Sequence, residues 1–168
     1  MKSLVPKIAD ALLARRWTLA TAESCTGGMI GAALTDLSGS SAWYLGGVIA
    51  YANSVKMKLL HVLEATLDAH GAVSPETARA MAQGIAQAVG ADCAIAVTGI
   101  AGPTGGTPEK PVGLVYIATT TPTGINVQAY HFDGSRAAIR STATRAACQQ
   151  LLDHLLIRNR FSGARTPA

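Results

Sequence analysis

The sequence is poor in charge, in aromatic residues and in cysteine. Only 14% of its 168 residues are charged and 5% are aromatic, whereas 49% are hydrophobic. Such a composition excludes a disordered chain, and the scarcity of charge favours a homo-oligomer that covers part of its surface. The three cysteines lie far apart and form neither a disulfide framework nor a zinc-binding pattern. This favours a reducing, cytoplasmic location.

Runs of one residue type are also missing. The net charge is +4, but lysines and arginines are scattered and aromatic residues are few, so we expect no nucleic-acid groove. No apolar stretch approaches the length of a membrane span, and the charged first sixteen residues predict an amphipathic helix instead of a secretory leader, so we expect no membrane partner. No histidine and carboxylate cluster has metal-ligand spacing, which predicts no metal.

Helical and strand patterns alternate along the chain and predict an α/β fold. Helical spacing occurs in residues 1–16, 27–37, 54–60, 64–70, 75–89 and 135–157. Strand patterns occur in residues 17–22, 43–52, 93–97, 112–120 and 125–132. We therefore predict a three-layer α/β/α sandwich around a mixed, mostly parallel five-stranded sheet whose fourth strand is antiparallel. One domain is expected over residues 1–160, with 161–168 as a flexible tail.

Short polar residues and glycines predict where the elements begin and end. Ser3, Asn53 and Ser74 each precede a helical run and are expected to cap it. Gly90 is expected to end the helix that Ser74 begins. The Gly46-Gly47 pair predicts a bulge or a close approach in the second strand.

Polar segments follow the strands that are expected to be parallel, and the last one opens the final helix. Ligands of such sheets bind beyond the carboxyl ends of the parallel strands. We therefore expect four distant segments to meet at one edge: Glu23-Ser24, Tyr51–Lys56, Thr98–Gly106 and Asp133–Arg140.

The segment Thr21–Gly28 holds a candidate nucleophile, Ser24, where a strand turns into a helix. A serine hydroxyl needs a base to become nucleophilic, and backbone N–H groups in such a turn can stabilise an oxyanion. A simple capping role for Ser24 or Thr26 is the alternative, which the local sequence alone favours. Cys25 is the rival nucleophile, because a helix N-terminus lowers a thiol pKa, but a core cysteine is the better interpretation.

Lys56 is the candidate base. It lies in the first turn of a predicted helix, where the helix dipole disfavours a cation. A partly buried lysine there has a lowered pKa and can accept a proton, whereas a solvated surface lysine is the alternative. Tyr51, at the end of the second strand, can donate a hydrogen bond or stack on a flat ring, or it can simply pack.

Two further features suit a phosphorylated ligand. The glycine-rich loop Thr98–Gly106 permits close backbone contact with phosphate or ribose, although it matches neither a P-loop nor a dinucleotide fingerprint. Arg136 and Arg140 lie one helical turn apart and can clamp a phosphate. Two surface arginines are the alternative.

These motifs together resemble the amidase family of the C-terminal domain of the competence/damage-inducible protein CinA, the nicotinamide-nucleotide amidases. The resemblance runs from about Ala9 to about Leu156. The motifs that carry it are Thr21–Gly28, Gly39–Trp43, Tyr51–Lys56, Gly71–Ser74, Thr98–Pro103 with Gly105-Gly106, and Lys110–Gly113.

The resemblance implies hydrolysis of the carboxamide of nicotinamide mononucleotide, with a small-molecule nucleotide as substrate and no metal or organic cofactor. It implies Ser24 as nucleophile, Lys56 as base and Tyr51 as a hydrogen-bonding assistant. Glu23 would orient Lys56 or bind ribose hydroxyls. The implied substrate-binding residues are Glu23, Thr26, Gly27, Gly28, Thr98, Gly99, Gly102, Arg136 and Arg140, with either arginine holding the phosphate.

Two other functions fit parts of the pattern. A non-catalytic nucleotide-binding or regulatory module would keep the glycine-rich loop and the arginines, but would not need Ser24 and Lys56 together. A purely structural α/β dimer would treat the polar strand ends as ordinary loops. The presence of both Ser24 and Lys56 favours the enzyme.

Overall fold

A twisted five-stranded sheet forms the centre of the protein in the computed structural model, which describes residue 1 and residues 3–156. The strands are β1 (Leu19–Glu23), β2 (Tyr44–Ile49), β3 (Cys93–Gly99), β4 (Leu114–Thr121) and β5 (Gly124–His131). Their order is β2-β1-β3-β4-β5. β1, β2 and β3 run parallel, and β4 runs antiparallel to β3 and β5. The predicted mixed sheet with an antiparallel fourth strand is confirmed.

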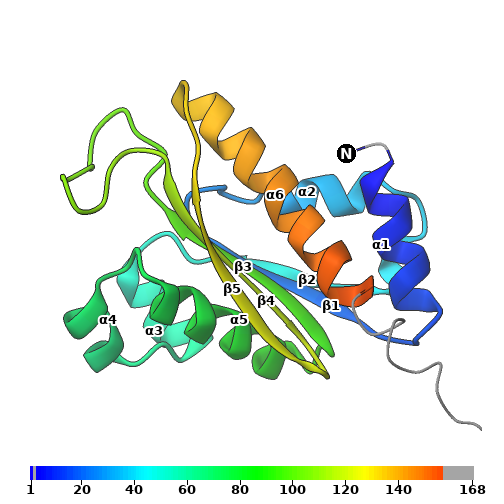
Figure 1. Cartoon of the computed structure of the whole chain (residues 1–168). Helices are drawn as coiled ribbons and strands as arrows, with labels where there is room; N and C mark the ends of the chain where they lie inside the picture. Colours follow the sequence, from blue (N-terminus) through cyan, green and yellow to red (C-terminus); the bar gives the residue numbers. More distant parts are fainter. Residues whose placement is uncertain (2, 157–168) are drawn as a thin grey trace, which may run out of the picture.

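Helices cover both faces of this sheet (Figure 1). One layer contains α1 (Leu4–Leu13), α2 (Met29–Thr35) and α6 (Arg136–Leu156). The other contains α3 (Asn53–Leu60), α4 (Glu64–His70) and α5 (Pro75–Val89). A short 3₁₀ helix, η1 (Ser40–Ala42), occupies part of the loop before β2. The predicted three-layer α/β/α arrangement is confirmed.

The two faces of the sheet are packed differently. Successive strand residues point to opposite faces, so each central strand contributes to two separate cores. Toward α1, α2 and α6 the central strands present large side chains, including Leu19, Ile95 and Val97. Toward α3, α4 and α5, β1 and β3 present mainly alanines: Ala20, Ala22, Ala94 and Ala96. Small side chains let α5 lie close to the sheet.

Capping differs from the sequence prediction at two helices. Ser74 accepts a hydrogen bond from the Thr77 amide and begins α5, as predicted. Ser3 makes no such bond at α1. Asn53 is the first residue of α3 and not its cap, because the extended residue Ala52 precedes the helix. The β-bulge of β2 lies where Leu19–Ala20 of β1 faces Tyr44–Gly46, so the expected irregularity at the glycine pair is present.

The carboxyl ends of β1, β2 and β3 meet at one edge of the sheet. The loop between β3 and β4 and the start of α6 lie at the same edge (Figure 1). The tail predicted at 161–168 lies outside the described residues. No helix among the described residues is long and apolar enough to cross a membrane.

Candidate functional site

A pocket of about 270 Å³ opens at this edge of the sheet. Each of the four predicted polar segments contributes to its wall. Seven of the residues predicted for the site line it: Ser24, Tyr51, Lys56, Thr98, Gly99, Gly102 and Arg136. Topology therefore brings together side chains that are up to 112 positions apart in the sequence, because parallel strands end at a common edge.

Ser24 and Lys56 contact each other in the wall of this pocket. The Nζ atom of Lys56 lies 3.3 Å from the Oγ atom of Ser24. Ser24 follows β1 directly, and Lys56 lies in the first turn of α3. Ser24 is 8% exposed and Lys56 only 1% exposed, so folding removes this amine almost completely from water.

The surroundings of Lys56 shift its amine toward the neutral form. Burial lowers the pKa of the Lys56 ammonium below its ordinary value, and the nearby Cys25 opposes this with a smaller effect. Its Nζ also lies 2.9 Å from the Ala50 carbonyl oxygen and 3.1 Å from that of Tyr51. A neutral amine has two N–H groups for these carbonyls and one lone pair for the Ser24 hydroxyl. The geometry therefore suits proton transfer from Ser24 to Lys56.

Cys25 lies beside Ser24 and also lines the pocket. Burial raises the pKa of its thiol to about 11, despite the lowering effects of its own backbone hydrogen bond and of Arg140. A thiol with this pKa is almost entirely protonated near neutral pH, and a thiolate is the reactive form. The geometry favours Ser24 over Cys25 as the nucleophile.

Tyr51 and Arg136 form a bridge at the mouth of the pocket. The Tyr51 side chain is 59% exposed. Its hydroxyl accepts a hydrogen bond of 2.9 Å from Nη2 of Arg136, and Nη1 of Arg136 donates to the Gly102 carbonyl at 2.8 Å. Arg136 thus connects the end of β2 with the glycine-rich loop, and its positive charge faces the pocket opening.

Thr98 ties the end of β3 to the segment before α5. Its hydroxyl donates a 2.6 Å hydrogen bond to the Ala72 carbonyl. This bond holds Ala72 and Val73 in the pocket wall, opposite the β1–α2 turn. The sequence predictions did not include these two residues in the site, although their segment is one of the motifs that resemble the CinA family.

Asn53 is a further lining residue that sequence reasoning missed as part of the site. It was assigned a capping role because asparagine commonly precedes helices. The signal that could have identified it was its place in the polar segment Tyr51–Lys56, three residues before the candidate base.

Arg140 and Glu23 do not line the Ser24–Lys56 pocket, and both make contacts with the backbone. The Arg140 guanidinium donates to the Cys25 and Thr26 carbonyls at 3.0 and 2.9 Å, so it is occupied by the backbone. The Glu23 carboxylate accepts hydrogen bonds from three backbone N–H groups, those of Gly28 before α2 and of Ile30 and Gly31 within it. The Glu23 residue is 2% exposed. The hydrogen bonds of the Lys56 amine go to Ser24, Ala50 and Tyr51, and not to Glu23.

Thr26, Gly27 and Gly28 are likewise absent from the pocket wall. Thr26 is fully buried, and its hydroxyl has no hydrogen-bond partner within the described part of the chain. Gly27 and Gly28 have φ values of +61° and +98°, which glycine tolerates. These three residues shape the turn after Ser24, and substrate binding by them stays a prediction.

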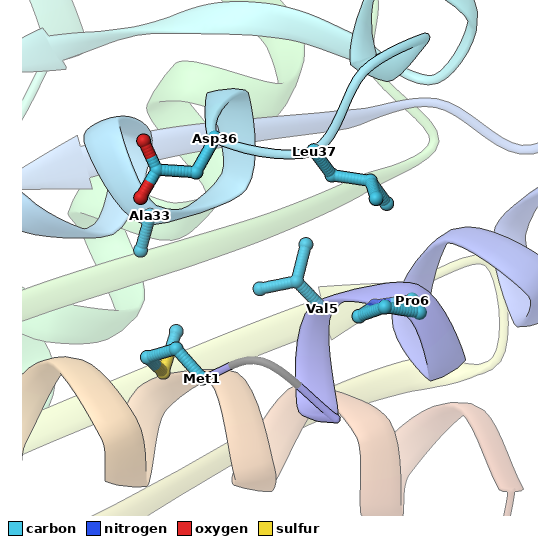
Figure 2. A pocket seen from close by; sticks show the side chains of 6 residues that line it. All are labelled: Met1, Val5, Pro6, Ala33, Asp36 and Leu37. Carbon is cyan, nitrogen blue, oxygen red and sulfur yellow. The ribbon is translucent and has the colours of Figure 1, made fainter.

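Another hollow, of about 320 Å³, lies between α1 and α2 (Figure 2). Its labelled lining residues are Met1, Val5, Pro6, Ala33, Asp36 and Leu37. It contains one carboxylate and no nucleophile or amine side chain, and it shares no residue with the Ser24–Lys56 pocket. Among the described residues, no group of three histidine, cysteine or acidic side chains is placed to hold a metal ion.

Comparison with known proteins identifies the family. The model of the CinA C-terminal domain matches residues 1–155. A CinA-like protein of Desulfotalea psychrophila is 53% identical over 149 residues, which cover 89% of this chain and 36% of that protein. A CinA-like protein of Geobacter sulfurreducens is 50% identical over 139 residues, covering 83% and 34%. The chain thus spans about a third of the length of these curated relatives.

Solved structures agree with this assignment. The competence/damage inducible protein CihA of Agrobacterium tumefaciens is 42% identical, with a TM-score of 0.87 over 90% of this chain and 93% of that one. The competence damage-inducible protein A of Klebsiella pneumoniae is 38% identical, with a TM-score of 0.89 over 93% and 97%. The chain therefore belongs to the CinA C-terminal domain family.

Proposed function

We propose that this chain is an amidohydrolase that converts nicotinamide mononucleotide to nicotinate mononucleotide and ammonia. The observation that carries the proposal is the 3.3 Å contact between the Ser24 hydroxyl and the buried Lys56 amine. A hydroxyl paired with a neutral amine is a recognised arrangement for nucleophilic acyl transfer. The nucleotide enters the proposal through the resemblance to the nicotinamide-nucleotide amidases.

The reaction proceeds in two halves. Neutral Lys56 accepts the Ser24 proton while Oγ attacks the carboxamide carbon. Protonated Lys56 then gives this proton to the leaving amine, and ammonia departs from an acyl-Ser24 ester. Water, deprotonated by the same amine, hydrolyses the ester and regenerates the hydroxyl. Each half passes one proton through Lys56: from Ser24 to the leaving amine in the first half, and from water to Ser24 in the second.

The negative charge that develops on the carboxamide oxygen needs hydrogen-bond donors. The Cys25 amide is the nearest candidate, because the residue after a nucleophile commonly supplies one donor. The Cys25 amide meets its own thiol sulfur, and no other described residue accepts a hydrogen bond from this amide or from that of Thr26. Preorganised donors of this kind stabilise a transition state without further rearrangement.

Arg136 is the proposed phosphate ligand. It is the arginine that lines the pocket, and its guanidinium lies between Tyr51 and the glycine-rich loop. Arg136→Gln should raise KM for the mononucleotide about 10- to 100-fold, because a charge-assisted hydrogen bond is lost. KM for nicotinamide riboside, which lacks the phosphate, should change less than threefold if that nucleoside is turned over at all. An equal loss with both compounds would contradict the phosphate role.

The direct test of the proposed activity is release of ammonia and of nicotinate mononucleotide by the purified protein, with Ser24→Ala as the control. Binding of the nucleotide without turnover would favour the regulatory module instead. If the protein neither binds nor converts the nucleotide, the structural role is the one that remains.

A further inference from the structure

We infer that Glu23 and Arg140 are positioning residues that hold the backbone of the Ser24 turn, one through its N–H groups and the other through its carbonyls, a role that rests on the proposed function of Ser24. The turn comprises residues 24–28 and joins β1 to α2. Glu23 binds backbone N–H groups on the α2 side of this turn. Arg140, from α6, binds backbone carbonyls within it.

Glu23 replaces the missing cap of α2. The residue before this helix is Gly28, in a left-handed conformation and without a side chain to cap it. Oε2 of Glu23 accepts the Gly28 and Ile30 amides, both at 3.0 Å, and Oε1 accepts the Gly31 amide at 2.8 Å. Three charge-assisted hydrogen bonds from one buried carboxylate fix the start of α2 relative to the end of β1.

Arg140 orients the peptide groups that follow Ser24. Its Nε donates to the Cys25 carbonyl and its Nη2 to the Thr26 carbonyl, so one planar guanidinium holds two consecutive peptides. Arg140 also lies so close that a Cβ atom on Gly27 would be 3.0 Å from Nη2. A lysine, with one ammonium group, does not reproduce this fork.

These contacts determine where the free amides of the turn point. In a trans peptide the N–H is opposed to the carbonyl. The Ser24 carbonyl accepts from the Gly27 amide, which directs the Cys25 N–H away from the interior of the turn. The Cys25 carbonyl faces Arg140, which directs the Thr26 N–H away from α6. The amides of Cys25 and Thr26, from which no other described residue accepts a hydrogen bond, are therefore oriented by carbonyls that are already engaged.

The negative Glu23 and the positive Arg140 bind different groups of the backbone. Glu23 satisfies N–H groups and Arg140 satisfies C=O groups, so the backbone between them is held without using the Ser24 hydroxyl. Gly31 leaves room for Tyr44 beside the carboxylate, since a Cβ there would lie 2.9 Å from the Tyr44 hydroxyl and in ordinary contact, at 3.6 Å, with Oε1 of Glu23. Ser24 keeps its contact with Lys56 because its backbone is fixed by other groups.

Serine labelling tests this role without the nucleotide. An alkyl fluorophosphonate loses fluoride when Oγ bonds to its phosphorus, and the hydroxyl proton passes to the base. The rate is measured by intact-protein mass spectrometry as a function of pH in the parent, in Glu23→Gln and in Arg140→Lys. Matched controls are Asp36→Asn at the far end of α2 and Arg145→Lys on the exposed face of α6.

We expect the plateau rate to fall about 10- to 100-fold in both variants, because small misplacements of a reacting group have effects of this size. The pH midpoint, which reports Lys56, should stay within about 0.3 units of the parent value if neither residue acts on the charge of the base. The controls should keep the parent rate and midpoint. Folded fractions, from thermal unfolding followed by circular dichroism, normalise every rate.

Three results overturn the inference. A parent protein that is not labelled at Ser24 removes the proposed nucleophile and the positioning role with it. A labelled parent with variants that react at the parent rate removes only the positioning role. A shifted midpoint with an unchanged plateau makes Glu23 or Arg140 an electrostatic partner of Lys56. If Glu23→Gln does not fold, Arg140→Lys decides, because it keeps its charge at a half-buried position.

Discussion

The β1–α2 and β2–α3 junctions lie at the same edge of the sheet but are held in different ways. Neither helix has a side-chain N-cap. At β1–α2, Glu23 and Arg140 bind the backbone, and the Ser24 hydroxyl is left for chemistry. At β2–α3, the Lys56 amine itself binds the Ala50 and Tyr51 carbonyls. The first junction separates support from reactivity, whereas the second combines them in one side chain.

Removing the nucleophile should produce the largest effect and leave the first junction intact. Ser24→Ala should lower kcat by about 10⁴-fold or more while changing nucleotide affinity little, because the hydroxyl bonds only at the reacting carbon. Steady-state kinetics and calorimetric titration measure the two quantities. Cys25→Ala is the control and should keep most of the activity, since a thiol with a pKa near 11 is not the attacking group. An active Ser24→Ala protein would refute the assignment.

Replacing the base should affect both chemistry and support at the second junction. Lys56→Arg should lower kcat by about 10²- to 10⁴-fold, because a guanidinium stays protonated and cannot accept the Ser24 proton. Lys58→Arg is the matched control, since Lys58 lies on the same helix and is exposed. Parent-like kinetics in Lys56→Arg would mean that another group takes the proton.

The pH dependence of activity and of the free energy of unfolding should report the charge of Lys56, and therefore the β2–α3 junction. Activity should rise with pH as the amine loses its proton, with a midpoint below that of an ordinary lysine, because burial lowers the folded-state pKa. At pH values between the folded-state and unfolded-state pKa of Lys56, the amine is protonated in the unfolded chain and largely neutral in the folded protein. The free energy of unfolding of the parent should therefore rise with pH in that window, relative to Lys56→Met.

Denaturant titrations of the parent and Lys56→Met at several pH values measure this difference. A difference that is constant across the window would show that Lys56 has the same pKa in the folded and unfolded chains. The Lys58→Met variant, which retains Lys56, is the control and should differ from Lys56→Met in the same way as the parent does.

The smallest expected effect concerns the helix that carries Lys56. α3 ends at His61, whose φ of +53° is left-handed, whereas α5 ends at Gly90 with φ of +67°. His61→Gly should raise the free energy of unfolding by about 1 kcal/mol, because glycine adopts this conformation without a Cβ clash. Chemical denaturation measures the change, with Gly90→Ala expected to destabilise by a similar amount. A destabilised His61→Gly protein would mean that the imidazole makes a compensating contact.

The sequence patterns were sufficient for the fold and for the meeting of Ser24 and Lys56. Strand periodicity and the hairpin at residues 121–124 predicted a mixed sheet, and the sheet predicted a common edge for Ser24 and Lys56. Parallel strands force this meeting whatever the loops do. The roles of Glu23 and Arg140 were not predictable in the same way, because both depend on where a side chain turns after the backbone has been placed.

Arg136 and Arg140 illustrate this limit. Helical spacing puts them on one face of α6, and the sequence offered no way to distinguish them. The Arg136 guanidinium binds the Gly102 carbonyl at the pocket mouth. One helical turn further on, the Arg140 guanidinium binds the carbonyls of Cys25 and Thr26. Distances of a few ångströms, set by packing between α6 and α2, decide which arginine can meet a ligand.

The amino-acid order by itself determined the alternation of helices and strands, the edge at which the polar residues gather and the chemical types that meet there, since these follow from periodicity and chain direction. Tertiary structure alone decided that the Lys56 amine loses its water, that Glu23 and Arg140 bind the backbone, and that Arg136 faces the pocket. The physical reason is that desolvation and hydrogen-bond partners are properties of the packed interior, where groups from distant segments compete for the same donors and acceptors.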